Sequence, residues 1–240
     1  MGASVKPMDV SLIIPVYNGV RLVEETTRAY RDAFSKSNRI GSFEIILVSN
    51  NCSDGSPAVC AKLARSLSHV KHVDYPFRTL KGGAVIRGFQ LAKYSWVGFT
   101  DVDMSTSPHE FLKLIPPLHD SQVGAVIASR KMPDSILHPP QPFFRIFLGN
   151  MFAFIRECLF GLGVMDSQCG AKMFKKADIF PLELTTNGWA FDVELLYRVK
   201  QHGKEIREVG ITWRDGPETT VSFSTPFTMF GELLRLRLRV

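Results

Sequence analysis

The sequence predicts a single α/β domain in which helices flank a mostly parallel, Rossmann-like sheet. Size is the first observation, because 240 residues, 45% of them hydrophobic, suffice for one core of this kind. Order is the second, since apolar runs rich in β-branched residues alternate with helical patterns, and strands linked by helices usually pair in parallel. Composition is the third: 22% charged and 11% aromatic residues exclude disordered, collagen-like and coiled-coil chains.

The first half of the chain contains the predicted strands. Short apolar runs place them at Val10–Val16, Phe43–Val48, Val70–Tyr75, Trp96–Thr100 and Val123–Ala128. Turn residues and a helical pattern follow each of the first two, and a further helix is expected over Gly83–Lys93. Ligands of open parallel sheets bind outside the carboxyl ends of the strands, so we expect the loops after Val16, Val48 and Thr100 to converge.

A proline-rich stretch divides the chain into two functional halves. Its four prolines, within Met132 to Pro142, disfavour regular elements, so we expect a linker or mobile loop there. The second half is predicted to contain a helix over Phe143–Gly161, a short strand near Ala171–Lys175 and a helix over Phe191–Gln201, which Gly203 ends.

The charge balance favours an anionic partner. Lys and Arg number 29 against 23 Asp and Glu, a formal charge of +6. The basic residues are spread along the chain without a nucleic-acid-binding motif, which argues against a nucleic acid. No CxxC pair or zinc spacing occurs among the cysteines, which we interpret as reduced thiols: Cys52, Cys60, Cys158 and Cys169.

The chain shows neither a signal-peptide pattern in its first eight residues nor a membrane-spanning run. The longest apolar tract, residues 143–165, is interrupted by charged residues and falls short of the roughly 18 apolar residues that a spanning helix needs. We therefore expect a cytoplasmic protein without a transmembrane segment.

Asp101 and Asp103 follow a predicted buried strand, where alternate residues can turn two carboxylates toward one crevice. Such oxygen ligands suit Mg²⁺ or Mn²⁺ bound to a diphosphate. A solvated turn or a helix cap is the alternative for an isolated DxD triplet. The run Ser105 to Pro108 looks like the start of a new helix.

Two further turns contain groups suited to a nucleotide. Lys81-Gly82-Gly83 precedes a helix that contains Arg87, so backbone amides and cations could meet an anion there; a flexible turn is the alternative. The turn over residues 49–55, rich in side-chain donors and acceptors, could hold a base or ribose. Equally, Ser53 or Asp54 could cap the following helix.

Polar groups are also concentrated in the second half. The segment DSQCGAK, residues 166–172, combines a carboxylate, an amide, a glycine and a cation between apolar segments. Asp192 and Glu194 lie at a predicted helix start, where the helix dipole also favours acids, so capping and catalysis are equally good interpretations of each.

These motifs, in this order, resemble the family 2 inverting glycosyltransferases of GT-A fold, and among them most of all the dolichyl-phosphate glucosyltransferases and their polyprenyl-phosphate relatives. The likeness rests on SLIIPVYN, KGGAVIRG, DVDMSTSP, DSQCGAKMF and WAFDVELL, and spans about Val10 to Leu234. It implies a single GT-A domain over residues 1–240, with a nucleotide-binding half at about 9–131 and an acceptor-binding half at about 143–240. It also implies metal-dependent transfer of a hexose, most of all glucose, from a nucleoside diphosphate sugar, most of all UDP-linked, to a polyprenyl or dolichyl phosphate.

The resemblance also assigns roles to individual residues. It places near the donor nucleotide Pro15, Tyr17, Asn18, Asn50, Asp54, Lys81, Arg87 and Asp101. It assigns Mg²⁺ or Mn²⁺ to Asp101 and Asp103. It gives roles at the sugar diphosphate, the acceptor phosphate and the reacting centre to Asp103, Ser129, Arg130, Gln168, Lys172 and Asp192. This chain has Ser49 and Asn50 where the family usually has two acids; an amide can still bond a pyrimidine edge, so base selectivity is in question.

Many relatives add transmembrane helices, so membrane contact here must come from elsewhere. The helix over residues 143–161 has an apolar side, Phe143, Phe147, Met151, Phe154 and Cys158, edged by Arg145 and Arg156. That side could lie in a lipid interface at the cytoplasmic membrane face, or be buried against the sheet. The tail arginines at 235, 237 and 239 could attract anionic lipid or belong to a solvated end.

The implied reaction needs no strong base, since a phosphate monoester with a second pKa around 6 is mostly a dianion at neutral pH and is itself the nucleophile. A metal would neutralise the departing diphosphate. Two alternatives remain open. The same fold could use a soluble glycan or hydroxyl acceptor, with Asp192 or Glu194 as base. The protein could also bind a nucleotide sugar without turnover.

Overall fold

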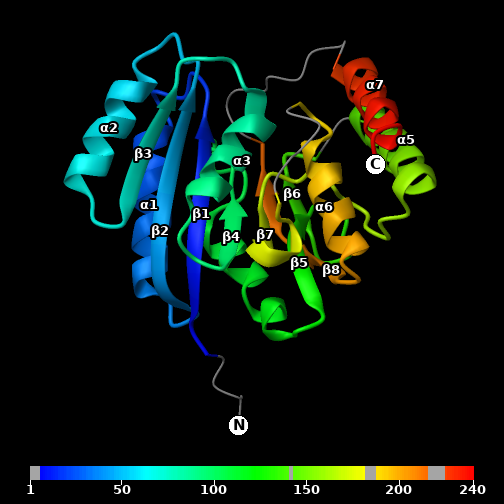
Figure 1. Ribbon diagram of the computed structural model, residues 1–240, viewed down its shortest axis with the longest axis horizontal. Coiled ribbons are helices and arrows are strands. Elements are labelled where there is room, and N and C mark those ends of the chain that lie inside the picture. The colour runs from blue at the N-terminus through cyan, green and yellow to red at the C-terminus, as the bar shows by residue number, and fades with distance from the viewer. Residues whose placement is uncertain (1–5, 141–142, 182–187, 216–224) are drawn as a thin grey trace.

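A computed structural model of the chain contains a seven-stranded sheet with helices on both faces (Figure 1). The structure describes residues 6–140, 143–181, 188–215 and 225–240, and for residues 145 and 225–227 it describes the backbone only. Among the described residues, no helix is long and apolar enough to cross a bilayer.

The strand order in the sheet is β3-β2-β1-β4-β7-β5-β8. The strands are β1 Met8–Val16, β2 Ile40–Asn50, β3 Val70–Tyr75, β4 Trp96–Phe99, β5 Val123–Ser129, β7 Lys172–Lys175 and β8 Glu205–Gly210. Only β7 runs against its neighbours β4 and β5, while the other pairings are parallel. The predicted α/β class with a mostly parallel sheet is therefore confirmed.

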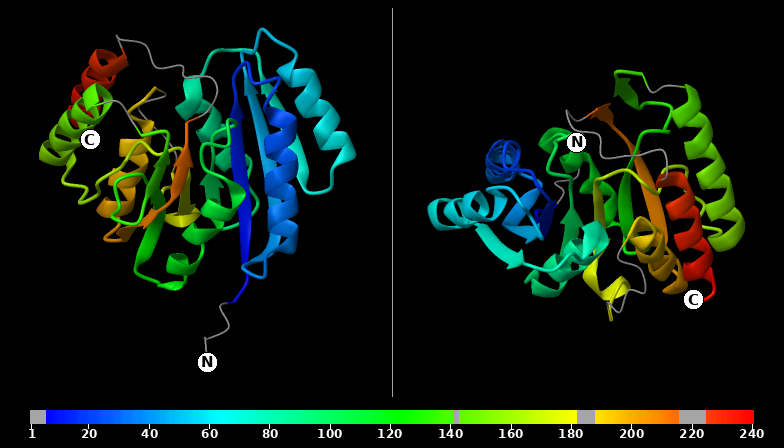
Figure 2. Two further views of the ribbon diagram at one scale, coloured as in Figure 1. Left: turned by 180° about the vertical axis from the view of Figure 1, so that it is seen from behind. Right: turned by 90° about the horizontal axis from the view of Figure 1, so that it is seen from above.

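The longer helices lie on the two faces and at one edge of this sheet. They are α1 Val23–Lys36, α2 Ser56–Ser66, α3 Leu80–Leu91, α5 Phe143–Phe160, α6 Phe191–Gln201 and α7 Thr225–Arg237. Figure 2 shows α1 and α2 on one face, α3 and α6 on the other, and α5 beside α7 at the edge. The remaining described helices are short. They are α4 Pro108–Phe111 and the 3₁₀ helices η1 Leu112–Leu114, η2 Pro116–His119 and η3 Lys176–Asp178.

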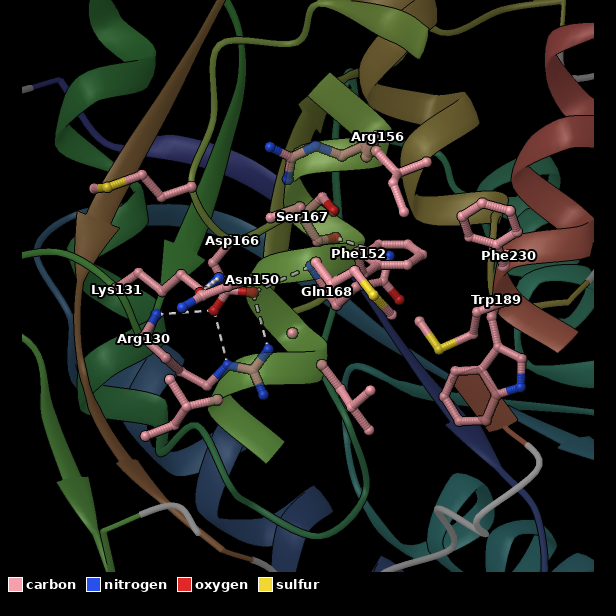
Figure 3. Close-up of a pocket in the computed structure, with 18 of the residues that line it drawn as sticks. Arg130, Lys131, Asn150, Phe152, Arg156, Asp166, Ser167, Gln168, Trp189 and Phe230 are labelled. Atoms are coloured by element: carbon pink, nitrogen blue, oxygen red, sulfur yellow. Dashed lines mark hydrogen bonds and ion pairs between the residues drawn. The ribbon is translucent and has the colours of Figure 1, made fainter. Parts of the chain in front are cut away.

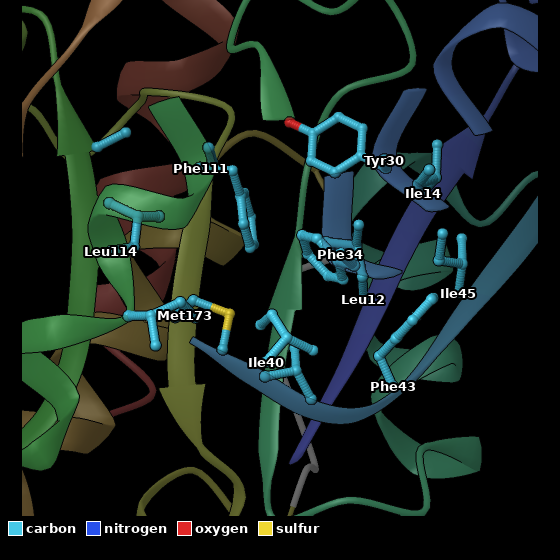
Figure 4. Packing of buried hydrophobic residues seen from close by; sticks show 14 of the residues in the cluster. Leu12, Ile14, Tyr30, Phe34, Ile40, Phe43, Ile45, Phe111, Leu114 and Met173 are labelled. Carbon is cyan, nitrogen blue, oxygen red and sulfur yellow. The ribbon is translucent and has the colours of Figure 1, made fainter. Parts of the chain in front are cut away.

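Alternation along β1 divides the core into two layers. Leu12 and Ile14 face α1, where Tyr30 and Phe34 pack against them (Figure 4), while Ile13 faces α3. A side chain at Gly88 of α3 would overlap Ile13, so this glycine allows the helix to approach the sheet closely.

Two predicted details need correction. The helix expected from Gly83 begins at Leu80, so Lys81 lies in its first turn and not in a preceding loop. The proline-rich stretch is not wholly irregular, because β6, Ile136–His138, lies within it and pairs in parallel with β9, Thr212–Arg214; Pro142 lies outside the described residues. The tail belongs to α7 as far as Arg237, and α7 buries Leu233 and Leu236 while the arginines at 235, 237 and 239 are exposed.

Candidate active site at the strand ends

The loops after β1, β2 and β4 converge, as predicted. The backbone N–H of Val20 donates to Asp54 Oδ2 over 3.0 Å, and the backbone N–H of Ser53 donates to Asn18 Oδ1 over 2.8 Å. Thr26 of α1 donates to the backbone oxygen of Val102 after β4, over 2.6 Å. Asp54 also accepts from the backbone N–H of Ser56, the first residue of α2, so it joins two loops and contacts the helix start, although Gly55 and not Asp54 is at the N-cap.

The first strand leads into an exposed loop. Pro15 is half-buried near the end of β1, Tyr17 is exposed, and Asn18 has a φ of 49° that asparagine tolerates better than most residues. Ser107 confirms the predicted helix start after β4, because its Oγ accepts from the backbone N–H of Glu110 with Pro108 in the first turn.

Asn50 lies at the end of β2 with its side chain almost fully buried. Its Nδ2 donates to the backbone oxygen of Leu80 over 2.9 Å, and its Oδ1 accepts from the backbone N–H of Thr79 over 2.9 Å. Leu80 has a φ of 55°, which is strained for a leucine. Asn50 therefore holds the strained turn that directly precedes Lys81.

Arg87, further along α3, lies with its guanidinium 5.7 Å from the ring centre of Tyr75.

Lys81 and Asp101 form an ion pair of 2.6 Å at the carboxyl end of β4. Burial opposes the lysine charge, but Asp101 and Asp192 outweigh burial and raise the pKa of Lys81. Gly170 packs so closely on Asp101 that a Cβ would overlap its carboxylate. The segment DSQCGAK thus packs directly against the DxD motif, although the two are about 65 residues apart in the sequence.

Asp103 is the second carboxylate of the DxD motif. Its Oδ1 accepts from the backbone N–H of Ser105 over 2.9 Å, and burial together with the charge of Asp101 raises its pKa. Among the described residues, no group of three or more His, Cys, Asp and Glu could hold a metal. Two carboxylates do fit a Mg²⁺ or Mn²⁺ ion that takes its other oxygen ligands from a diphosphate, since hard cations prefer such donors.

Lys172 and Asp192 form a second ion pair, deeper in the protein. Lys172 Nζ lies 2.5 Å from Asp192 Oδ1 and 2.6 Å from the backbone oxygen of Cys169, and both side chains are buried. Burial raises the pKa of Asp192, although Lys172 and Lys81 oppose the rise. Lys172 is therefore positioned to hold Asp192 rather than to reach an open surface.

The ammonium groups of Lys172 and Lys81 both lie over the ring of Phe99. Below, Lys81, Asp101, Asp103, Lys172 and Asp192 are called the strand-end cluster.

Glu194 lies apart from this cluster. Its carboxylate is buried and pairs with Arg198, one turn along α6, over 3.2 Å. Of the two acids at this helix start, only Asp192 belongs to the strand-end cluster.

A second feature is a cavity of about 720 Å³ between α5, α7 and the segment that begins at Met165 (Figure 3). We call it the helix cavity. Its apolar wall is formed by Leu137, Ile146, Leu148, Met151, Phe152, Ile155, Trp189, Met229 and Phe230. Its polar end includes Arg130, Lys131, Arg156, Asp166, Ser167 and Gln168. A cavity with an apolar wall and a cationic end suits an amphipathic anion.

Arg130 and Asp166 form a two-pronged ion pair at the polar end. Arg130 Nε lies 2.7 Å from Asp166 Oδ2, and Nη2 lies 2.9 Å from Oδ1. Burial opposes ionisation of Asp166, but Arg130 outweighs burial and holds the pKa of this carboxyl well below its usual range. Gln168 donates its backbone N–H to the same carboxylate over 3.2 Å. Ser129 is buried, and its Oγ accepts from the backbone N–H of Lys131 over 3.3 Å.

Sequence reasoning missed Glu208 on β8. Its two carboxylate oxygens accept from the backbone N–H groups of Met165 and Asp166, over 2.6 and 2.9 Å. The available signal was an acidic residue next to Val209 and Gly210 near the end of a β-branched run. Glu208 anchors the segment that joins the helix cavity to the strand-end cluster.

The apolar side of α5 faces outward. Phe143, Phe147 and Phe154 are 83%, 56% and 69% exposed, so the alternative in which this side is buried against the sheet is wrong. Arg156 is also not at an exposed basic edge, because it is 2% exposed and lines the helix cavity. The Arg145 side chain lies outside the described residues.

The mostly parallel sheet, with carboxylates and lysines at its strand ends, is the fold of GT-A glycosyltransferases of known structure. The family model for glycosyl transferase family 2 matches residues 11–179, and the chain belongs to that family.

Comparisons with other proteins agree with this assignment. A dolichyl-phosphate beta-glucosyltransferase from Dictyostelium discoideum is 30% identical over 247 residues, covering 96% of this chain and 74% of that protein. The glycosyltransferase AglD of Haloferax volcanii is 27% identical over 224 residues, covering 91% of this chain but only 35% of AglD.

Solved structures share the fold. The glucosyl-3-phosphoglycerate synthase of Mycobacterium tuberculosis, in complex with Mn²⁺, UDP and phosphoglyceric acid, superposes with a TM-score of 0.69 at 15% identity, covering 96% of this chain and 78% of that one. The mannosyl-3-phosphoglycerate synthase of Rubrobacter xylanophilus superposes with a TM-score of 0.72 at 15% identity, covering 97% and 74%.

Proposed function

We propose that this glycosyltransferase moves glucose, with inversion, from UDP-glucose to a polyprenyl phosphate such as dolichyl phosphate. The observation that carries the proposal is the helix cavity, whose apolar wall and cationic end match a lipid phosphate and whose polar segment continues to the strand-end cluster. The glucose and the lipid phosphate are supported by the names of relatives such as the Dictyostelium enzyme.

The donor is assigned to the strand ends. Pro15, Tyr17 and Asn18 would border the nucleotide, and Asp54 would keep their loop in place through Val20. Asn50 would act mainly by fixing the turn before Lys81, since both ends of its amide bond that turn. A uridine nucleotide is supported by a structural neighbour solved with UDP, whereas a mannosyltransferase neighbour was solved with GDP-mannose.

Asp101 and Asp103 would hold Mg²⁺ or Mn²⁺, as neighbours solved with Mn²⁺ also support. When bound, the ion supplies Lewis-acid stabilisation of the departing diphosphate. Lys81 binds Asp101 over 2.6 Å and so orients this carboxylate while adding positive charge near the leaving group.

The acceptor would approach from the helix cavity. Its phosphate dianion is the nucleophile, and Arg130 and Gln168 would align it with the sugar carbon, so no residue has to remove a proton. Lys172 would act indirectly by holding Asp192 at the back of the cluster. In this arrangement residues 9–131 form the nucleotide-binding half and residues 143–240 the acceptor-binding half of one domain.

The outward side of α5 would contact the membrane from which the acceptor comes. Exposed aromatic residues such as Phe143 and Phe154 can enter the lipid interface, while the exposed Arg235 and Arg237 on the neighbouring α7 can meet anionic headgroups. We therefore propose peripheral binding at the cytoplasmic membrane face.

The test is transfer of labelled glucose from UDP-glucose, with Mn²⁺ or Mg²⁺, to farnesyl phosphate and in parallel to a soluble oligosaccharide. We expect product with farnesyl phosphate only, and none when GDP-mannose replaces UDP-glucose. Product with the oligosaccharide alone would favour a soluble hydroxyl acceptor, with Asp192 as the available base. Binding of the donor without any product would favour a nucleotide-sugar-binding protein.

A further inference from the structure

The Arg156 guanidinium is buried at the helix cavity with most of its hydrogen-bonding capacity unused. Its side chain is 2% exposed and lines the cavity (Figure 3). Nη2 donates to the backbone oxygen of Val164 and lies 3.4 Å from the carboxylate of Glu157. Nε and Nη1 have no hydrogen-bond partner in the described part of the chain. Unpaired buried donors are costly, so Nε and Nη1 are candidates to donate to an acceptor that a ligand supplies.

Ser167 provides a second unpaired group in the same cavity. Its residue is 2% exposed, it lines the cavity, and its Oγ has no hydrogen-bond partner among the described residues. In the view of Figure 3, Ser167 is drawn between Arg156 and the Arg130–Asp166 pair. A hydroxyl and a guanidinium together supply the donors that a phosphate group requires.

The charged groups around the polar end of the cavity include both cations and carboxylates. Asp166 neutralises Arg130 through a two-pronged ion pair, but Lys131 donates its ammonium to the neutral amide of Asn150. Burial lowers the pKa of Lys131, and the positive charges of Arg130 and Arg156 add to this effect, whereas Asp166 and Glu208 oppose it. Glu157 lies 3.4 Å from Arg156, and Glu208 binds the backbone of Met165 and Asp166, so three carboxylates balance the three cations. An anion would therefore be held by the unpaired donors and not by an excess of positive charge.

We propose that Nε and Nη1 of Arg156, with Ser167 Oγ, bind the phosphate monoester of an amphipathic ligand whose apolar chain lies between α5 and α7. Phe152 of α5 and Phe230 of α7 both line the cavity and would contact the chain. This inference rests on the proposed function, because it adds Arg156, which lies outside the motifs, and Ser167 of DSQCGAK to the residues around the acceptor phosphate.

The test compares Arg156→Met, Arg156→Lys and Ser167→Ala with wild type. Methionine fills a similar volume without charge, so the buried position should remain packed. Lysine keeps the positive charge but lacks the planar set of N–H donors of the guanidinium. Arg65→Met, an exposed arginine of α2, is the matched control. Calorimetry would measure binding of farnesyl phosphate, farnesol, a short-chain phosphatidic acid and inorganic phosphate, and also of UDP. The melting temperature of each variant checks its folding.

We expect Arg156→Met and Ser167→Ala each to weaken farnesyl phosphate binding by at least about tenfold, since a hydrogen bond to a charged group contributes about 1.5–3 kcal/mol. Farnesol and UDP binding should not change, and Arg65→Met should behave as wild type. Tighter binding of phosphatidic acid than of farnesyl phosphate would identify a membrane lipid, not the acceptor, as the source of the phosphate.

Equal affinity of wild type, Arg156→Met and Ser167→Ala for farnesyl phosphate would overturn the inference. If the wild type then still transfers glucose to farnesyl phosphate, the proposed function stands without this site. If instead farnesyl phosphate binds through Arg156 but receives no sugar, the site stands and the proposed function is wrong.

Discussion

The strand-end cluster and the helix cavity differ in how their charges are compensated. In the cluster, Lys81 pairs with Asp101 over 2.6 Å and Lys172 with Asp192 over 2.5 Å. In the cavity, Arg156 keeps two nitrogens without a partner among the described residues, and the adjoining side of α5 exposes aromatic rings.

This difference indicates how each region would work. Charges that the protein itself holds in place cost no reorganisation when a reaction begins, so the cluster is preorganised for chemistry. Unpaired donors and exposed apolar area are completed only when a ligand or a surface arrives, so the cavity and α5 are built for binding. The following changes would break or sharpen this distinction.

The largest effect is expected for Asp103→Ala, which removes the proposed metal ligand from the cluster. Transfer should fall by about 10³-fold, the upper range for losing one preorganised electrostatic contact. Initial rates with saturating Mn²⁺ measure the loss, and a chelator should bring wild type to a similar rate. Asp32→Asn on the exposed side of α1 is the control. Retained turnover in Asp103→Ala would contradict the metal assignment.

Lys172→Met should destabilise the fold by about 3–5 kcal/mol, because it leaves the Asp192 carboxylate buried without its partner. Urea unfolding measures the change. The double variant Lys172→Met/Asp192→Leu should regain most of the loss. Lys113→Met, which breaks a more exposed pair with Glu110, should cost about 1 kcal/mol or less. Equal effects of the two single variants would contradict the buried pairing.

Asp166→Asn should remove a stabilisation that depends on pH. Arg130 lowers the pKa of this carboxyl in the folded protein, so the contribution is complete above the unfolded-state value of about 4 and is lost as the pH falls. Wild type should exceed the variant by about 2 kcal/mol at pH 7, and the gap should narrow below pH 4. Urea unfolding at pH 7, 5 and 3 measures this gap, and a constant gap would contradict the ion pair.

The smallest effect is expected on the outer side of α5. Phe143→Ser/Phe154→Ser should reduce partitioning onto anionic vesicles about tenfold, since rings that enter the interface only in part gain a fraction of the free energy of complete burial, about 1.5–3 kcal/mol. Sedimentation with vesicles measures it, and the solution melting temperature should not fall. Phe77→Ser, equally exposed in the loop after β3, is the control. Equal losses for both changes would show non-specific adhesion.

Local patterns were sufficient to predict the sheet and much of the site. An apolar run places β3, and a helical pattern ended by Gly203 places α6, at the bounds that the structure has, because periodicity and turn residues act over a few neighbours. The convergence of the loops after β1, β2 and β4 followed from parallel pairing alone. The DxD motif was likewise visible, since its two carboxylates are two residues apart.

The tertiary structure decided which polar groups are partnered. The residues next to Asn50 in the sequence do not indicate that its side chain forms hydrogen bonds with Thr79 and Leu80. In the same way, the residues next to Asp166 do not indicate that its backbone N–H donates to Glu208. The same holds for α5, where a helical wheel gave an apolar side but not its exposure, and placed Arg156 at an edge that is in fact buried. Partners from distant segments fix burial and pairing, whereas the sequence by itself determines the elements because their signals are local.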